Sequence, residues 1–124
     1  MNAKERIMDS GDLKIGISED ESLISISWSG RSTERDPGKF LNPVLGEAFK
    51  TADTEGKSVL LDFKNLEYMN SSTVTPVVKI LSDAGKGIKS ILIKYNNKFR
   101  WQQVSFSALQ VFAAKDTRIS IVGE

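Results

Sequence analysis

Cysteine and histidine are both absent from the 124 residues of this sequence. Without cysteine there are no disulfide bonds and no thiolate metal sites. Without histidine the chain also lacks the commonest general base and the commonest metal ligand, and neither Cys-based nor Ser-His nucleophile systems can be built. An enzyme would have to work with carboxylates, lysines and hydroxyl groups alone. We therefore expect no enzymatic activity, no metal site and no cofactor.

A charge of one sign and long apolar stretches are also lacking. Lysine and arginine number 17 and aspartate and glutamate 16, which gives a formal net charge of +1. No strong field therefore directs the protein to nucleic acid or to a membrane surface. No segment approaches the roughly 20 apolar residues of a membrane span, and the polar first residues do not resemble a signal peptide. We expect a cytoplasmic protein, a monomer or weak dimer, that acts on other proteins.

What the sequence does contain is typical of one soluble domain over residues 1–124. Hydrophobic residues make up 40% of the chain and charged residues 27%, as in ordinary globular domains. Residues 1–12 are polar and are predicted to form a flexible lead. Apolar residues then alternate with polar ones over 13–17 and 23–28, on either side of an acidic turn, and Gly30 ends the second of these strands. This alternation predicts an N-terminal β-hairpin with one face toward the core.

Helices and strands alternate after the hairpin. Asp36 and Pro37 are typical of an N-cap and a first helical residue, and the helical spacing then continues for about 14 residues. Residues 58–63 are typical of a central strand covered on both faces, followed by a loop over 64–72. We further predict strand 91–95, helix 99–112 with Val104 on its apolar face and Phe106 off it, and strand 119–122. This order predicts an α/β fold with a mixed, mostly parallel sheet and helices packed on it.

Three adjacent hydroxyl residues, Ser71, Ser72 and Thr73, stand where a second helix is predicted to begin. The apolar residues that follow have the spacing of one helix face: Val74, Val77, Val78 and Leu81. Pro76 fits the first helical turn, which places the N-cap near Ser72 or Thr73. Ser71 would then lie just before the helix, at its positive end, where a phosphate is favoured. The alternative interpretation is that these hydroxyls only cap the helix.

Residues 59–63 (Val-Leu-Leu-Asp-Phe) and 69–73 (Met-Asn-Ser-Ser-Thr) resemble the signature of STAS domains, the family of bacterial anti-sigma factor antagonists. In that family a strand ending in Asp leads through a loop into Asp-Ser-Ser/Thr-Gly at a helix N-terminus. The hydroxyl residue after the second Asp is phosphorylated by a partner serine kinase/anti-sigma factor and dephosphorylated by a PPM-type phosphatase. The resemblance therefore implies a STAS-like fold and these two protein partners.

The resemblance also implies roles for individual residues. Ser71 stands at the position of the phospho-acceptor, and Ser72 is a second, less favoured candidate. The implied partner-binding surface comprises Asp62, Tyr68, Met69, Asn70, Ser71, Ser72 and Thr73, bordered by Lys98 and Arg100 at the same end of the sheet. Two residues depart from the family pattern. Asn70 replaces the usual Asp and so removes a carboxylate, and Thr73 replaces the usual Gly.

Basic residues suggest two weaker candidate sites. Arg35 lies in the charged connection over 31–39, a kind of segment that is most often simply solvated, but arginine readily recognises phosphate or an acidic partner. Ser72 and Lys79 nominally match a Ser-Lys nucleophile pair. Two helical turns separate them by roughly 10 Å, which is too far for direct proton transfer.

Three functions from different classes are compatible with these features. The first is a phosphorylation-controlled protein-binding module of a bacterial partner-switching system, which binds a serine kinase while Ser71 is unphosphorylated. The second is a constitutive STAS-like scaffold or small-ligand-binding module, which Asn70 and Thr73 favour. The third is a small enzyme that uses Asp62, Glu67 and the hydroxyls, and the absence of His and Cys counts against it. We adopt the first as the hypothesis.

Overall fold

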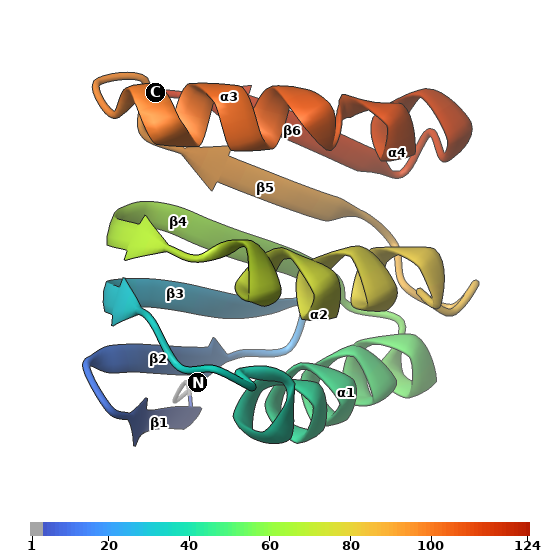
Figure 1. The fold of residues 1–124 in the computed structure, drawn as a ribbon. Coiled ribbons are helices and arrows are strands. Elements are labelled where there is room, and N and C mark those ends of the chain that lie inside the picture. Colours follow the sequence, from blue (N-terminus) through green and yellow to red (C-terminus); the bar gives the residue numbers. More distant parts are fainter. Residues whose placement is uncertain (1–3) are drawn as a thin grey trace.

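The computed structural model describes residues 4–124, which form one six-stranded sheet and four helices (Figure 1). The elements follow in the order β1 (Lys4–Ser10), β2 (Leu13–Glu19), β3 (Leu23–Ser32), α1 (Gly38–Glu55), β4 (Ser58–Met69), α2 (Ser71–Ser82), β5 (Ile91–Tyr95), α3 (Arg100–Ala108), α4 (Gln110–Lys115) and β6 (Ile119–Gly123). The first three strands pair antiparallel, and β3 to β6 pair in parallel. The predicted α/β fold, with its N-terminal hairpin and mixed sheet, is confirmed.

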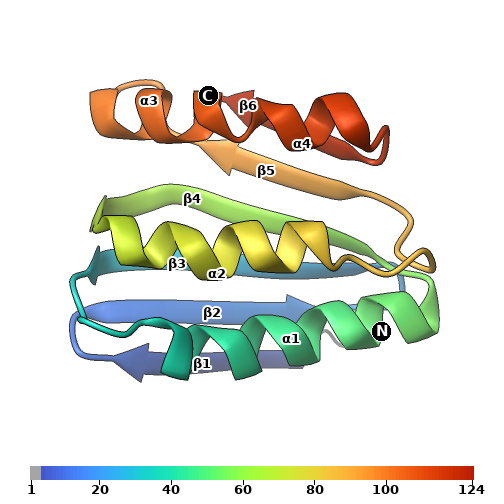
Figure 2. The ribbon, with the colours of Figure 1, turned by 45° about the vertical axis from the view of Figure 1, so that its right-hand side comes forward.

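All four helices lie on the same face of the sheet (Figure 1, Figure 2). Strands β3 to β6 stand side by side in chain order. Crossovers between parallel strands are right-handed, so crossovers that all step in one direction place every connecting helix on one side. The strand residues that face the helices form the core, and Ile26, Leu61 and Ile93 among them are fully buried. The other face of the sheet is open.

The open face corrects the prediction that the central strand is covered on both faces. Leu61 and Phe63 of β4 are fully buried, whereas Leu60 and Asp62, which alternate with them, are only half-buried. Leu60 is paired in register with Leu92 of β5, and cross-strand neighbours of this kind shield each other without a second helix layer. The short apolar run in β4 therefore belongs to a strand that is covered by helices on one face only.

The N-terminal segment is the second correction. Residues 4–10 form strand β1, which pairs with β2 from Lys4 opposite Glu19 to Ser10 opposite Leu13, so the prediction of a flexible lead is wrong for this part. The first three residues of that predicted lead lie outside the described residues. β1 is polar because it is an edge strand on which most side chains are exposed, and charged side chains are the usual protection of such an edge. Backbone pairing with β2 holds β1 in place. The amino-acid composition of the segment gives no sign of this pairing.

The predicted loop over 64–72 is largely strand. β4 continues to Met69 beside β3, with register shifts in this pairing. Gln102 of α3 is fully buried beneath this irregular part and donates from Nε2 to the carbonyl oxygens of Phe63 (2.7 Å) and Leu66 (2.8 Å). Its Oε1 accepts from the backbone N–H of Asn96 (2.7 Å). A side chain from another element thus satisfies backbone groups that a regular ladder would pair.

The third predicted helix is divided into α3 and α4 at Leu109. Phe106, predicted to lie off the apolar face, is fully buried, with its ring 4.8 Å from Phe63 and stacked 5.5 Å from Tyr95. Val104, which was assigned to the apolar face, is 64% exposed. The prediction was wrong because the buried face includes the polar Gln102, which a search for apolar spacing passes over.

Helix α1 is the longest helix and packs mainly beside α2. It begins at Gly38 with Pro37 as the N-cap residue, one position later than predicted, and runs for 18 residues with Pro43 inside it. Leu41, Leu45 and Phe49 form its buried face. In the part of the chain from residue 4 to 124, none of the helices combines the length and the apolar character needed to cross a bilayer.

Candidate functional site

Ser71 is the first residue of α2, and Asn70 is its N-cap. Asn70 has extended backbone angles, and its Oδ1 accepts from the N–H of Thr73 (3.1 Å) and from the Thr73 hydroxyl (2.7 Å). The predicted N-cap at Ser72 or Thr73 is therefore wrong. Pro76 lies in the second helical turn rather than the first, so it does not mark the start as expected. The N-cap is instead the residue whose side chain reaches the free N–H groups.

A partly buried hydrogen-bond network holds this helix start against β3. The Asn70 N–H donates to the Ser32 carbonyl (3.0 Å), and the hydroxyls of Ser32 and Thr73 lie 2.6 Å apart with both residues buried. Because the Thr73 hydroxyl donates to Asn70, the Ser32 hydroxyl is the donor to Thr73. The Asn70 amide also donates from Nδ2 to the Glu34 carbonyl (2.9 Å). The network, termed here the Asn70 network, comprises Ser32, Glu34, Asn70 and Thr73.

The two departures from the STAS pattern belong to this network. An aspartate at position 70 would place a carboxylate oxygen against the Glu34 carbonyl, so two acceptors would face each other where Nδ2 now donates. A glycine at position 73 would remove a fully buried side chain and its two hydroxyl bonds. The side chains of Asn70 and Thr73 are therefore hydrogen-bonded to each other, and they also bond to Glu34 and Ser32.

Substitutions of Asn70 test this structural role. We expect Asn70→Ala to lower the free energy of unfolding by about 1–2 kcal/mol, because the cap is lost. Asn70→Asp keeps the cap but loses the bond to Glu34, and we expect a loss of about 1 kcal/mol. Urea unfolding measures both, with Asn65→Asp at an exposed strand position as the matched control. An Asn70→Asp protein as stable as the parent would contradict the assignment.

The two serines at the helix start are both exposed, in contrast to Thr73. The first backbone N–H groups of a helix have no intrahelical partner and carry the positive end of its dipole. A negative group on either hydroxyl is therefore favoured electrostatically. The Asn70 network beneath fixes the backbone that carries the hydroxyls, so they are presented in a defined position.

Tyr68 forms an aromatic surface beside the helix start. Its ring is 40% exposed, the Arg31 guanidinium carbon lies 5.2 Å from the ring centroid, and the Trp101 ring lies at 6.4 Å. Through Trp101 the start of α3, with exposed Lys98 and Arg100, lies at the same end of the sheet as Tyr68. Tyrosine, tryptophan and arginine are the residues that most often dominate binding energy in protein interfaces.

The structure removes three predicted residues from this surface. Met69 is 8% exposed and Thr73 is fully buried, so they support the surface from below. Asp62 lies within β4, where it alternates with the buried Leu61 and Phe63 and so faces the open side of the sheet, and it accepts from the N–H of Lys64 (3.0 Å). Nearby on this side, hydrogen bonds from Lys64 and Lys94 hold the pKa of Glu124 below its ordinary value.

The site also contains residues that the sequence analysis missed. Arg31 and Ser32 were assigned to a loop because Gly30 was taken as the end of a strand. Gly30 instead adopts a φ of 81°, where a Cβ would collide with the carbonyl of Asp12, and β3 continues beyond it. A glycine at a strand bulge was the signal that could have indicated this continuation. Within residues 4–124, no group of three or more acidic side chains is placed to hold a metal ion.

No family model matches the sequence, and no curated protein matches it. Solved structures do match. An anti-sigma factor antagonist from Mycobacterium paratuberculosis matches with a TM-score of 0.64 and 11% identity, covering 84% of this chain and 86% of that chain. This chain has the fold of an anti-sigma factor antagonist.

Two further proteins share this fold. SiaC of Pseudomonas aeruginosa matches with a TM-score of 0.60 and 14% identity, covering 95% of this chain and 98% of that chain. The crystal structure of the diguanylate cyclase SiaD in complex with its activator SiaC matches with a TM-score of 0.62, 16% identity and coverage of 96% and 99%. A protein with a SpoIIAA-like fold from Shewanella loihica matches with a TM-score of 0.57, 18% identity and coverage of 93% and 90%.

The anti-sigma factor antagonist fold is the one that the STAS resemblance implied, and that prediction is confirmed. It was drawn from two short motifs, whereas the structural matches extend over most of the chain. Within this fold the exposed serines of α2, the Tyr68 surface and the start of α3 lie together at the end of the parallel strands. That end of an open α/β sheet is where ligands and partners gather.

Proposed function

We propose that this chain is the phosphorylation-controlled binding protein of a partner-switching system. In this proposal the unphosphorylated Ser71 surface docks on a serine kinase that acts as an anti-sigma-type partner. The observation that carries the proposal is the exposed Ser71, the first residue of α2, which stands on the partly buried Asn70 network. A kinase can reach this hydroxyl without unfolding the chain. The adjacent Tyr68 surface supplies aromatic and basic groups for docking.

The switch itself is an electrostatic change. The kinase transfers the γ-phosphoryl group of a nucleoside triphosphate to Ser71 Oγ, so an O–P bond forms and the β–γ anhydride bond breaks. Nucleoside diphosphate and the hydroxyl proton leave. The phosphate brings about −1.5 to −2 charges into a surface that binding would desolvate, and this ends the contact. A PPM-type phosphatase restores the hydroxyl by hydrolysis, so both catalytic sites lie on partners.

A second candidate replaces the kinase by a partner enzyme that the chain activates. The similarity to SiaC supports it, because SiaC is the activator of the diguanylate cyclase SiaD and the match spans nearly the whole of both chains. The docking surface would be the same. The constitutive alternative, without a phospho-switch, is supported by Asn70 and Thr73, whose side chains are engaged in holding the helix.

Variants of Ser71 test the switch. We expect Ser71→Asp to weaken binding to the host serine kinase at least tenfold, or about 1.4 kcal/mol, because it places charge in the interface. Ser71→Ala should bind constitutively. Calorimetric titration with the purified kinase measures both affinities, and Ser107→Asp on the exposed side of α3 is the matched control.

Mass spectrometry decides whether the modification occurs. Peptides are compared from protein purified from its own host and from protein incubated with the host's serine kinases and ATP. A single phosphate on Ser71 is the expected result. Equal kinase affinity of Ser71→Asp and Ser71→Ala, together with an unmodified Ser71 under every condition, would leave the constitutive module as the better description.

A further inference from the structure

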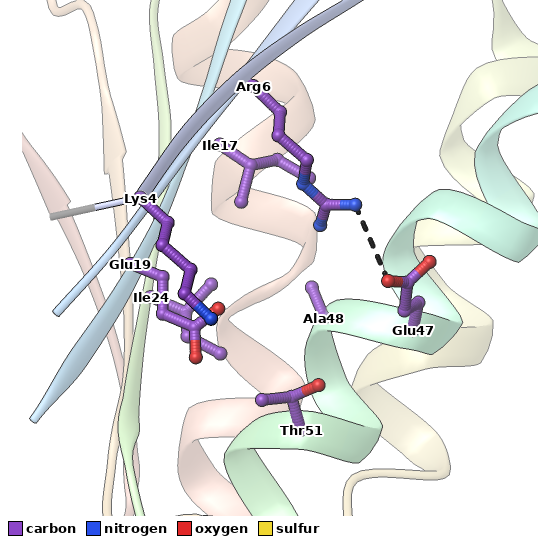
Figure 3. A pocket seen from close by; sticks show the side chains of 8 residues that line it. All are labelled: Lys4, Arg6, Ile17, Glu19, Ile24, Glu47, Ala48 and Thr51. Atoms are coloured by element: carbon purple, nitrogen blue, oxygen red, sulfur yellow. Dashed lines mark hydrogen bonds and ion pairs between the residues drawn. The ribbon is translucent and has the colours of Figure 1, made fainter. Parts of the chain in front are cut away.

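A pocket of about 300 Å³ lies between the start of α1 and the first turns of α2. Its polar lining consists of Arg35, Asp36, Asn42, Ser72, Thr75 and Lys79. Ser71 does not line this pocket. A different pocket, between β1 and α1, contains the ion pair of Arg6 with Glu47 (Figure 3), and its Glu19 is paired with Lys57 from outside the lining, so most of its charges are already matched. In the part of the chain that the structure describes, no ion pair is formed within the pocket beside Ser72.

Helix geometry explains why the two adjacent serines face different surroundings. Ser72, Thr75 and Lys79 recur at the spacing of one helix face, and all three line the pocket. Ser71 is turned by about 100° from Ser72 around the helix axis. The hydroxyl of Ser71 therefore belongs to the outer surface described above, and that of Ser72 belongs to the pocket.

The pocket carries an excess of unpaired positive charge. Arg35 and Lys79 line it against a single carboxylate, Asp36. Among the described residues, neither cation has an ion pair within 4.0 Å. The carboxylate of Glu34, next to Arg35 in sequence, is turned toward Gly11 instead. An added anion would therefore meet two cations that form no ion pair, against the single carboxylate of Asp36.

A phosphate on Ser72 would extend this side chain toward the two cations, which line the same pocket. Two helical turns separate Ser72 from Lys79 by roughly 10 Å. Side chains on a helix lean toward its N-terminus, so the lysine extends back toward Ser72. Arginine adds a planar fork that matches phosphate oxygens in pairs.

We propose that a phosphate on Ser72, unlike one on Ser71, is bound within the chain by Arg35 and Lys79. The inference rests on the proposed function, since a kinase with a nucleoside triphosphate as donor must act at this helix start. Phosphorylation of Ser71 then changes the charge of the outer surface. Phosphorylation of Ser72 links α2 to Arg35 in the segment before α1. It leaves the charge of the outer surface nearly unchanged. The two adjacent serines thus have different regulatory consequences.

Phosphorus NMR titration of two proteins, with phosphoserine incorporated during translation at position 71 or 72, tests the proposal. An unperturbed phosphoserine has a second pKa of about 6. We expect the phosphate at position 72 to titrate about 1 pH unit below the phosphate at position 71, because two cations stabilise its dianion. The helix start acts on both phosphates, so the difference between them isolates Arg35 and Lys79.

Substitutions in the protein phosphorylated at position 72 assign the effect. Arg35→Gln and Lys79→Gln should each remove part of the difference, and the double variant should remove it. Lys39→Gln is the control, because Lys39 is exposed near the same segment but does not line the pocket. Thermal unfolding of each variant confirms that it is folded.

Equal titration of the two phosphates, or a difference that survives the double variant, would overturn the inference. This outcome is separate from the kinase-binding test of Ser71. A lower pKa at position 72 combined with equal kinase affinity of the Ser71 variants would support the pocket and overturn the switch. Equal titration of the two phosphates, combined with weaker kinase binding by Ser71→Asp than by Ser71→Ala, would support the switch and overturn the phosphate site in the pocket.

Discussion

Phe106→Ala is expected to lower the free energy of unfolding by about 3–5 kcal/mol, the usual cost of truncating a buried phenylalanine. The ring is fully buried between Phe63 of β4 and Tyr95 of β5, at centroid distances of 4.8 and 5.5 Å. Its loss would open a cavity where the C-terminal helices meet the sheet. Chemical denaturation followed by tryptophan fluorescence measures the change.

Val104→Ala on the same helix is the control for this prediction. Val104 is 64% exposed, so its truncation should change the stability by no more than about 0.5 kcal/mol. The sequence pattern alone predicts the opposite order, since it places Val104 on the apolar face and Phe106 off it. A larger effect at Val104 than at Phe106 would mean that α3 is rotated relative to the structure.

Gln102→Glu replaces only the amide nitrogen by an oxygen, yet it should lower the free energy of unfolding by about 3 kcal/mol or more at neutral pH. The fully buried amide donates to the carbonyls of Phe63 and Leu66, and a carboxylate would face both oxygens without a proton. Burial would raise the pKa of the new carboxyl group. The matched control is Gln103→Glu, an exposed neighbour whose amide donates to the Asn97 carbonyl.

The destabilisation caused by Gln102→Glu should depend on pH, because the new carboxyl group has a raised pKa in the folded state. A group with a raised pKa in the folded state contributes stability below its unfolded pKa and loses it as pH rises through the folded pKa. The gap in stability between the parent and Gln102→Glu should therefore narrow as the pH is lowered from 7 toward 5. Urea unfolding at both pH values measures it. A gap that stays constant would show that the introduced carboxyl is not buried.

Gln102 also has a consequence for the candidate site. It joins the irregular end of β4 to the loop after β5 through Phe63, Leu66 and Asn96. Tyr68 and Ser71 follow directly from that part of β4, and Trp101 precedes Gln102 on α3. The proposed docking surface therefore depends on the same side chain that completes the core. Gln102 is buried and cannot contact a partner. Loss of kinase binding in a folded Gln102 variant would therefore indicate that the proposed docking surface has been displaced.

The sequence predicted those features that depend on local patterns. Alternation over 13–28 predicted the hairpin, and the apolar spacing after residue 73 predicted α2 behind a strand. The order of elements predicted the mixed sheet, and Ser71, which was expected just before a helix, is the first residue of α2. Even the wrong N-cap was in error by two or three residues only, because the serines, threonine and asparagine in this segment all cap helices well.

Several of the errors share one physical cause. Gln102, Ser32 and Thr73 are polar residues that the structure buries, and each is satisfied by partners that are distant in sequence or on another element. Local pattern reports apolar side chains, so it assigned such residues to surfaces and loops. The extension of β4 was missed for the same reason, since its irregular carbonyls depend on a side chain of α3.

The sequence by itself determined that this is one α/β domain, that it carries no cysteine or histidine chemistry, and that a pair of serines opens a helix after a central strand. These properties follow from composition and periodicity, which are local. The tertiary structure alone decided that every helix lies on one face of the sheet, that Asn70 caps α2, and that Ser71 and Ser72 face different surroundings. Those properties depend on which distant backbone and side-chain groups meet, and that choice is made only when the whole chain packs.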